Sequence, residues 1–289
     1  MLKGLQAVKI LQYLIEAVDL SVYSYIKPAA IHRYSLYDQD LHKYVKTVTV
    51  ALPSYLHASN LGESIAKGGI GIPTANLGKL VSQAISTSIS KLSTNTIAEL
   101  HLMLIPTAVA ISYALSIDRS INLNTFRKAI GLIFTYSEVK DALDIYAVLK
   151  KFDKYQRLLA ELGISEGVIR TNSMNLRNLY LALGRKVLPL SILVDKLDVV
   201  VGMSNRFIKV YEELYDYNLA TISSYIYGLE SLYNVSFRSD LLKERNVMNE
   251  LYRLDKEFRS KGYNFNDFIP VLSTSTMLSL CTLEYSGKG

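Results

Sequence analysis

Apolar residues recur at steps of three and four along most of this chain, the spacing that places them on one face of an α-helix. One such stripe lies near the start of the chain and another near its end: Leu5, Val8, Leu11, Leu14, Ile15 and Val18, then Val247, Leu251, Leu254 and Phe258. The β-branched segment 45–52 also fits helical spacing. No run of strand alternation stands out, so we predict an all-α, single-domain bundle of about ten helices.

The segment 100–117 is apolar enough to raise the question of a membrane span. At roughly 18 residues it is at the short limit for crossing a bilayer. It also carries polar residues and a proline: His101, Pro106, Thr107 and Ser112. We therefore predict a buried core helix here and no membrane span.

The charge and the cysteine content restrict the classes of ligand and site. The formal net charge of +6 over 289 residues suits anionic ligands such as nucleotides or CoA. No clustered basic stripe gives a strong nucleic-acid signal. Cys281 is the one cysteine, which excludes a disulfide within the chain and argues against a thiolate metal site. The chain does not begin like a secretion signal, so we expect a cytoplasmic protein.

A polar segment, "IKPAAIHRYSLYDQD" (26–40), interrupts the apolar helical pattern near the start of the chain. It gathers charged and polar groups in one connection: Lys27, Pro28, His32, Arg33, Asp38 and Asp40. Two interpretations stay open, an active-site loop and a solvated connection between helices.

Further carboxylates and amides are scattered through the helical segments: Asn95, Glu138, Asp141, Asp195 and Asp198. Carboxylates on facing helices of a bundle can hold metal ions that bind phosphates. Purely structural roles are also open for these residues. Acids in a first turn favour the helix dipole, as for Glu138 and Asp141, and "TIAE" (96–99) matches a capping box. A functional or buried-network role for Asp198 is a further hypothesis, because charge inside an apolar run is costly unless exposed or paired.

The order of these pieces resembles the triphosphoribosyl-dephospho-CoA synthase family, especially its archaeal branch. Glu16 looks like the family's N-terminal helix glutamate, and four segments look like its other motifs: "KPAAIHRYSLYD" (27–38), "STNTIAELHLMLIPTAVA" (93–110), "EVKDALDIYAVLKK" (138–151) and "DKLDVVVGMSNRF" (195–207). The resemblance covers roughly residues 5 to 215 and implies an all-α fold. We expect a family-like helical core over 1–235 and a C-terminal helical extension, 236–289, packed on the same domain.

The resemblance implies transfer of the triphosphoribosyl group of ATP to a dephospho-CoA-like acceptor, with release of adenine and with Mg²⁺ as cofactor. Carboxylates and Mg²⁺ can stabilise positive charge on the sugar carbon and hold the triphosphate. By this resemblance, the substrate-binding residues are Lys27, His32, Arg33, Asn95 and Thr96. The metal ligands are Glu16, Asp38 and Asp141, and the catalytic groups are Asp38, Asp141 and Asp198.

Four departures from the family pattern support an alternative. The glycine expected after Asn95-Thr96 is replaced, and Glu99 stands close by in the sequence, which puts an anion near the phosphate site that the resemblance implies. The loop's Gly-Asn pair is Ala29-Ala30 here, and alanine resists both φ > 0 and close backbone approach to a phosphate. The arginine before the late aspartate is Leu197, and Ser35 stands where an acidic residue is common. The alternative is a catalytically degenerate member that binds a nucleotide or acts as a scaffold. Assembly into a homo-oligomer is left open.

Overall fold

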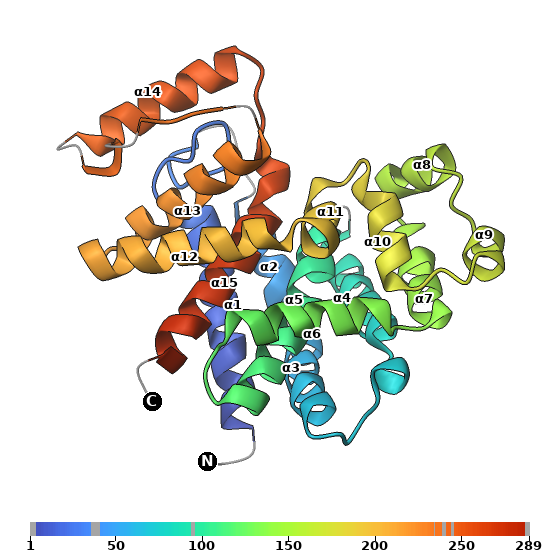
Figure 1. The fold of residues 1–289 in the computed structure, drawn as a ribbon. Helices are drawn as coiled ribbons and strands as arrows, with labels where there is room; N and C mark the ends of the chain where they lie inside the picture. The colour runs from blue at the N-terminus through green and yellow to red at the C-terminus, as the bar shows by residue number, and fades with distance from the viewer. Residues whose placement is uncertain are drawn as a thin grey trace.

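The computed structural model describes residues 4–35, 41–93, 96–233, 235–238, 241–243 and 246–286. Within these ranges the chain forms fifteen α-helices and three short 3₁₀-helices, with no β-strand. The predicted all-α class is confirmed (Figure 1). The helices outnumber the ten expected because residues 153–195 form four short helices, which periodicity alone does not separate.

The bounds of the elements are as follows. The first seven helices are α1 (Leu5–Tyr23), α2 (His42–Val50), α3 (Leu52–Ala66), α4 (Leu77–Leu92), α5 (Ala98–Asp118), α6 (Leu123–Thr135) and α7 (Val139–Leu149). They are followed by α8 (Asp153–Glu161), α9 (Glu166–Thr171), α10 (Leu176–Gly184), α11 (Leu188–Asp195), α12 (Leu197–Leu214), α13 (Tyr217–Leu232), α14 (Val247–Ser260) and α15 (Ile269–Ser286). The 3₁₀-helices are η1 (Ile72–Ala75), η3 (Leu241–Lys243) and η4 (Asn266–Phe268).

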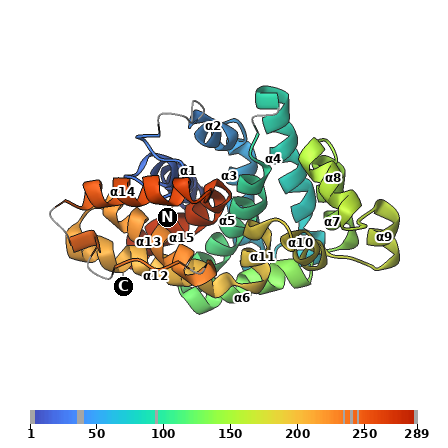
Figure 2. The same cartoon turned by 90° about the horizontal axis from the view of Figure 1, so that it is seen from above.

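Helix α5 lies at the centre of the bundle, as both ribbon views show (Figures 1 and 2). Nearly every residue from Ala98 to Leu115 is buried, because α1, α3, α4, α6 and α15 surround the helix. Among the described residues it is the one helix long and apolar enough to cross a membrane, and 83% of its apolar window is buried inside the protein. The predicted buried core helix is therefore confirmed.

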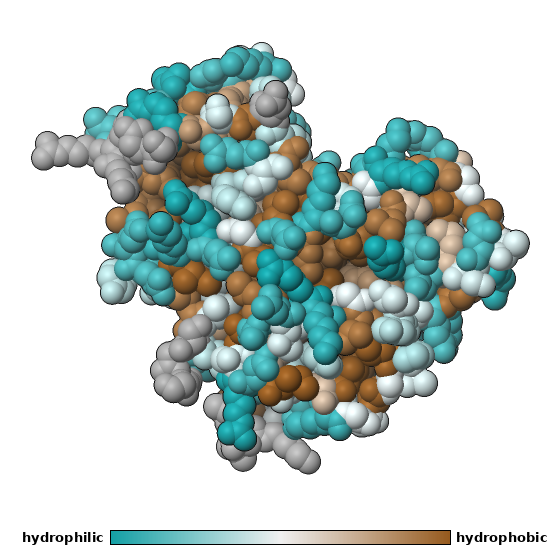
Figure 3. All heavy atoms as spheres, in the orientation of Figure 1, coloured by the Kyte–Doolittle hydropathy of each residue, from teal (hydrophilic) through white to brown (hydrophobic). Residues whose placement is uncertain are grey.

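The C-terminal helices take two different positions. Helix α15 runs alongside α1 and α12 and also contacts α5, so it belongs to the interior (Figure 1). Helix α14 lies at the surface, and Figure 3 shows hydrophilic residues over its outer side. Beneath α14, Leu251 and Phe258 are buried, as the apolar stripe of this helix predicts. Whether the chain divides near residue 235 stays a prediction.

Candidate functional site

The loop after α1 forms a tight turn over residues 27–30. The Ala30 N–H donates to the carbonyl of Lys27 at 2.9 Å, with Pro28 and Ala29 in the two central positions. Proline presets the second position of such a turn, and the third requires a positive φ. Ala29 has a φ of 59°, in the left-handed region. Alanine disfavours this conformation, as expected, but Ala29 adopts it here, and the reason lies in the contacts that hold the turn.

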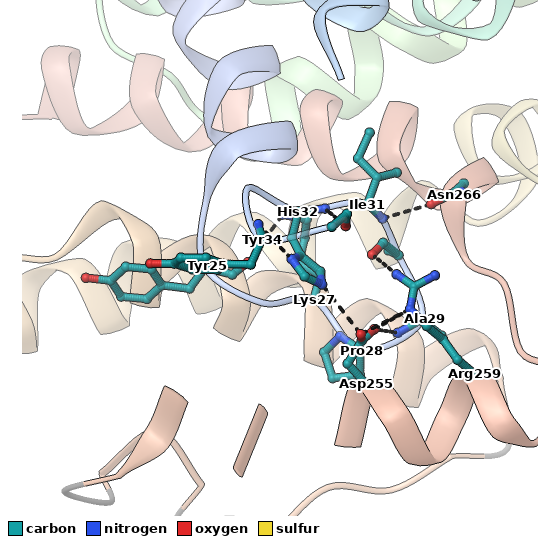
Figure 4. Close-up of polar contacts among 12 residues, drawn as sticks. Tyr25, Lys27, Pro28, Ala29, Ile31, His32, Tyr34, Asp255, Arg259 and Asn266 are labelled. Atoms are coloured by element: carbon teal, nitrogen blue, oxygen red, sulfur yellow. Dashed lines mark hydrogen bonds and ion pairs between the residues drawn. The ribbon is translucent and has the colours of Figure 1, made fainter. Parts of the chain in front are cut away.

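Side chains from the C-terminal part of the chain bind the N–H groups of this turn (Figure 4). Asp255 of α14 accepts from the Ala29 N–H at 2.8 Å, and Asn266 of η4 accepts from the Ile31 N–H, also at 2.8 Å. Both acceptors are oxygens, one of them anionic. The backbone of the turn thus binds an anion, and that anion belongs to the protein itself.

The carbonyl groups of the turn also have partners far along the chain. Tyr225 donates its hydroxyl to the Pro28 carbonyl at 2.7 Å. The Phe265 N–H donates to the Ala29 carbonyl at 2.8 Å, and Arg259 donates to the Ala30 carbonyl at 2.7 Å. Buried backbone groups need such partners. These contacts compensate for the left-handed conformation of an alanine, which costs about 1–2 kcal/mol.

Asp255 is the centre of this network. Arg259, one helical turn later, donates to both of its oxygens at 2.9 and 3.0 Å. Burial acts to raise the pKa of Asp255, but the His32 ring, the Ala29 N–H and the Arg259 charge together hold that pKa below its usual value. The carboxylate is therefore ionised at neutral pH, and its charge is matched by donors within the protein.

His32, predicted to bind substrate, faces the same carboxylate from the loop. Its Nδ1 accepts the Tyr34 N–H at 3.1 Å, which places the ring proton on Nε2. Nε2 lies 3.6 Å from Asp255 Oδ2, beyond hydrogen-bond distance. Only 2% of His32 is exposed. The ring is thus enclosed with Asp255 and not presented to solvent.

Lys27, predicted to meet phosphate, is fully buried. Its Nζ lies 3.0 Å from Ser24 Oγ and 3.4–3.5 Å from the carbonyls of Val22 and Tyr25. Burial, with a smaller contribution from Arg33, lowers its pKa well below the usual value. Among the described residues Lys27 forms no ion pair. Its amine contacts only oxygen atoms of the loop and of the end of α1, so its role here is structural.

Arg33 is the exposed cation of the loop. It donates to the Tyr23 carbonyl and to Asn218 Oδ1, the latter at 2.7 Å, and it lies over the Tyr25 ring. Three of the predicted substrate-binding residues thus lie on one loop. Two of them are buried in its interior, and the third is tied to α1 and α13.

The predicted carboxylates are held in separate places. Asp141 is buried at the start of α7, where its oxygens accept from the N–H groups of Gly78 and Glu138 at 2.8 and 3.0 Å. Glu138 and Asp141 form a capping box, whereas the structural role that the sequence left open for them was an interaction with the helix dipole in the first turn. Burial nevertheless raises the pKa of Asp141 above its usual value. Asp198 is 85% exposed and pairs with Arg127 on α6, so it takes no part in a buried network.

The predicted metal set does not form within the described residues. Glu16 lies on α1, and burial together with the neighbouring Asp19 raises its pKa. Asp141 lies on α7 with both oxygens engaged by backbone N–H groups. No group of three or more histidine, cysteine or acidic side chains in the described part of the chain is arranged to hold a metal. Asp38, predicted as both ligand and catalyst, lies outside the described residues, as does Asn95.

Thr96 is placed differently from its predicted capping role. Helix α5 begins at Ala98, so the preceding Ile97 is its N-terminal flanking residue and no capping box forms. The Ile97 N–H donates instead to Thr47 Oγ1 at 3.3 Å. Thr96 lines a cavity beside the start of α5.

This cavity, the α5 pocket, was not predicted. Its volume is about 340 Å³, and its polar lining consists mainly of Lys43, Thr96, Glu99, Lys154, Tyr155, Asn266 and Asp267. The lining residues come from α2, α5, α8 and η4, which are distant in sequence. No short sequence motif could therefore predict this pocket. Asn266 belongs both to this lining and to the contacts that close the loop.

Comparisons with known proteins give a similarity of fold. No protein-family model matches the sequence, and no curated protein matches it. One similar solved structure is a protein from Archaeoglobus fulgidus that is provisionally described as a triphosphoribosyl-dephospho-CoA synthase. The identity is 14% and the TM-score 0.49, over 80% of this chain and 97% of that chain. At this identity the likeness concerns the fold alone.

Proposed function

We propose that this chain binds a nucleotide-like or CoA-like small molecule without transferring a triphosphoribosyl group to it. The observation that carries the proposal is the contact between Asp255 and the Ala29 N–H. The family resemblance implies that the loop 27–38 handles phosphate. Here the N–H that would receive a phosphate oxygen already donates to a carboxylate.

A phosphate could reach this N–H only by displacing Asp255. That carboxylate is tethered next to the turn, so its effective concentration is high and a free ligand competes poorly. Displacement would also take the charge of Asp255 from its donors Ala29 and Arg259. Separating a buried charge from its partners is strongly unfavourable.

The predicted catalytic carboxylates give the transfer reaction little support. Positive charge on a sugar carbon is stabilised by groups aimed at one point. Asp141 is engaged in a helix cap and Asp198 in a surface ion pair, on helices α7 and α12. The described residues also offer no arrangement of ligands for the Mg²⁺ that the resemblance implies, so we assign no step to it.

The α5 pocket supports the binding half of the proposal. Its volume of about 340 Å³ is within the range of small-molecule sites. Charged and aromatic side chains line it together, including Lys43, Lys154 and Phe152. This mixed lining suits a ligand with an anionic group and a ring.

Two measurements on the full-length protein test the proposal. Thermal unfolding is followed with ATP and Mg²⁺, with dephospho-CoA, and with both, because a ligand that binds only the folded state raises the melting temperature. Adenine release is measured by chromatography in the same mixtures. We expect a raised melting temperature while adenine stays at the level of a protein-free control.

Two outcomes would contradict the proposal. Adenine release that scales with protein concentration and is abolished by Asp141→Asn would support the transfer reaction. An unchanged melting temperature at millimolar concentrations of every nucleotide would remove the binding role and leave the scaffold alternative.

A further inference from the structure

Most of the net positive charge of the chain lies in one stretch, residues 150–186, which we call the basic lobe. It contains eight lysine or arginine residues and three acidic ones, a surplus of five out of the six net positive charges of the whole chain. The basic lobe forms α8, α9 and α10 with their connections, at one end of the molecule and away from α12–α15 (Figures 1 and 2). A charge surplus confined to one part of a fold indicates an acidic partner there.

Four cations of the basic lobe have no partner within the described part of the chain. The side chains of Lys151, Arg157, Arg177 and Arg185 are exposed and make neither a hydrogen bond nor an ion pair there. An arginine without a carboxylate beside it offers all of its donors in a planar fork, which matches the geometry of a phosphate. Three of the four free cations are arginines, so the basic lobe is equipped for phosphate groups.

The ends of α8 and α10 lie side by side. Lys186, just after α10, forms an ion pair with Glu161 at the end of α8, at 2.7 Å. Arg157 is one turn before Glu161, and Arg185 is next to Lys186, so two of the free arginines lie close to this ion pair. Arg177 is two turns before Arg185 on the same side of α10, about 12 Å away along the axis. That length corresponds to about three or four phosphates of one strand in a duplex.

The uncharged side chains of the basic lobe indicate which acidic partner it fits. Val168 is the only large apolar side chain exposed between residues 150 and 186. Membrane surfaces and acidic proteins are both bound with several such side chains. No aromatic ring of the lobe is exposed, since Tyr155 and Tyr180 are buried and Phe152 is half-buried. The unstacked bases of a single strand would therefore find no ring to pack on.

We infer that the basic lobe binds the phosphate backbone of a nucleic-acid duplex, without reading its bases. Arg157, Arg177 and Arg185 each neutralise one phosphate. The lobe contains no run of more than two adjacent basic residues, so the sequence shows no basic stripe, and the packing of α8 beside α10 brings the arginines together. None of the three lines the α5 pocket, so this surface is separate from the small-molecule site of the proposed function.

The test is fluorescence anisotropy of the full-length protein with a labelled DNA duplex and with an RNA duplex of the same sequence. Binding is measured between about 50 and 200 mM salt. Three neutralised phosphates release their counterions, so the affinity for B-DNA should fall with a logarithmic slope of about −2.7, or about 40-fold over this range. Binding of DNA, RNA or both with such a salt dependence would support the inference. No binding at the lowest salt, or binding that does not depend on salt, would overturn it.

Neutral variants locate the duplex on the protein. Arg157→Gln, Arg177→Gln and Arg185→Gln are each expected to reduce the salt slope by about 0.9, because each removes one phosphate contact. The triple variant should lose the salt dependence. All three side chains are exposed, so the melting temperature of the triple variant should stay close to that of the wild type.

A second triple variant removes the same charge from other parts of the surface. Lys46→Gln, Arg119→Gln and Lys209→Gln change exposed side chains on α2, after α5 and on α12. This control should keep the wild-type slope. Equal losses in the two triple variants would attribute the binding to the net charge of the whole protein and would overturn its placement on the basic lobe.

Three competitors distinguish the duplex from other acidic partners. Vesicles that contain phosphatidylserine, polyglutamate and a single strand of the same sequence are each titrated at the same salt concentration. Each should bind at least about tenfold more weakly than the duplex, because none presents a rigid row of phosphates. Tighter binding of any of the three would overturn the assignment of the basic lobe to a duplex.

Discussion

The carboxylate of Asp255 accepts the backbone N–H of Ala29 at 2.8 Å, across 226 positions of the sequence. It joins the loop after α1 to a helix near the end of the chain. Asp255→Ala would leave this N–H and the Arg259 Nε–H without their acceptor, while Arg259 would still donate to the Ala30 carbonyl. We expect a loss of about 2–4 kcal/mol in the free energy of unfolding, measured by urea denaturation.

The matched control for Asp255 is on the same helix. Glu257 faces solvent and pairs with Arg253 and Lys261. Exposed ion pairs contribute little, so Glu257→Ala should cost much less than Asp255→Ala. Equal losses in the two variants would show that both substitutions destabilise α14 as a helix. The contact with Ala29 would then contribute nothing further to the free energy of unfolding.

The buried His101 makes stability depend on pH in the acid range. Its ring lies between the Tyr55 hydroxyl and Ser88 Oγ, each at 2.8 Å, and burial lowers its pKa to about 3. The unfolded chain binds a proton there below about pH 6.5, while the folded chain stays neutral. Stability is therefore lost as pH falls from 6.5 toward 3, by up to about 1.4 kcal/mol per pH unit.

Urea unfolding between pH 4.5 and 7 measures this contribution when the wild type is compared with His101→Gln. The variant should show a shallower fall in stability at acid pH. His57→Gln, at an exposed position, measures the general effect of replacing a histidine. A slope in His101→Gln as steep as that of the wild type would contradict the assignment.

Buried Lys27 makes stability depend on pH in the alkaline range. Burial lowers its pKa well below the usual value, so as the pH rises the folded chain releases this proton before the unfolded chain does. Stability therefore rises with pH until the unfolded lysine titrates near 10.4, by up to about 1.4 kcal/mol per pH unit. Lys27→Met keeps the buried chain length and removes this titration.

As the pH rises toward 10, the wild type should gain stability relative to Lys27→Met, with denaturant midpoints as the measurement. At pH 7 the variant should be about as stable as the wild type or more stable, because an amine no longer loses its hydration. A variant that is strongly destabilised at pH 7, with the wild-type slope retained, would mean that Lys27 is charged and well compensated inside the loop.

Two glycines in helices offer a test of the packing between α4 and α7. A Cβ on Gly78 would lie 2.1 Å from the Asp141 carbonyl oxygen, whereas a Cβ on Gly131 would meet no atom within 4 Å. Gly78→Ala should cost about 3 kcal/mol or more, because backbone would have to move. Gly131→Ala should stabilise α6 by about 0.5–1 kcal/mol. Thermal unfolding of the two variants compares them directly, and similar effects would refute the close approach.

The sequence predicts the helical architecture well because periodicity is a local signal. The apolar stripe of α1 and the continuous apolar run of α5 both correspond to buried surfaces. For Asp141 one of the two roles left open, a place in the first turn of a helix, is the one observed. The predicted start of α5 is one residue too early, because Ile97 and not Thr96 precedes the helix. The Ile97 N–H bonds to Thr47 on another helix, which the local sequence does not indicate.

The contacts of the loop could not be read from the sequence. Ala29 takes a positive φ because acceptors and donors from Asp255 onward bind both sides of its peptide, and nothing near residue 29 predicts them. The α5 pocket has the same origin, since Lys43 and Tyr155 meet only through the packing of α2 and α8. Contacts between residues that are distant in sequence produce no periodic pattern in the sequence, so they cannot be predicted from it.

The distance along the chain between the loop and its closing residues has a consequence for synthesis. The partners Asp255, Arg259 and Asn266 are synthesised 226 to 235 residues after the loop groups that they bind. Contacts of such high sequence separation form slowly. The loop therefore stays without these partners until α14 and η4 have been synthesised, and a chain shortened before α14 should expose the loop to proteases and chaperones.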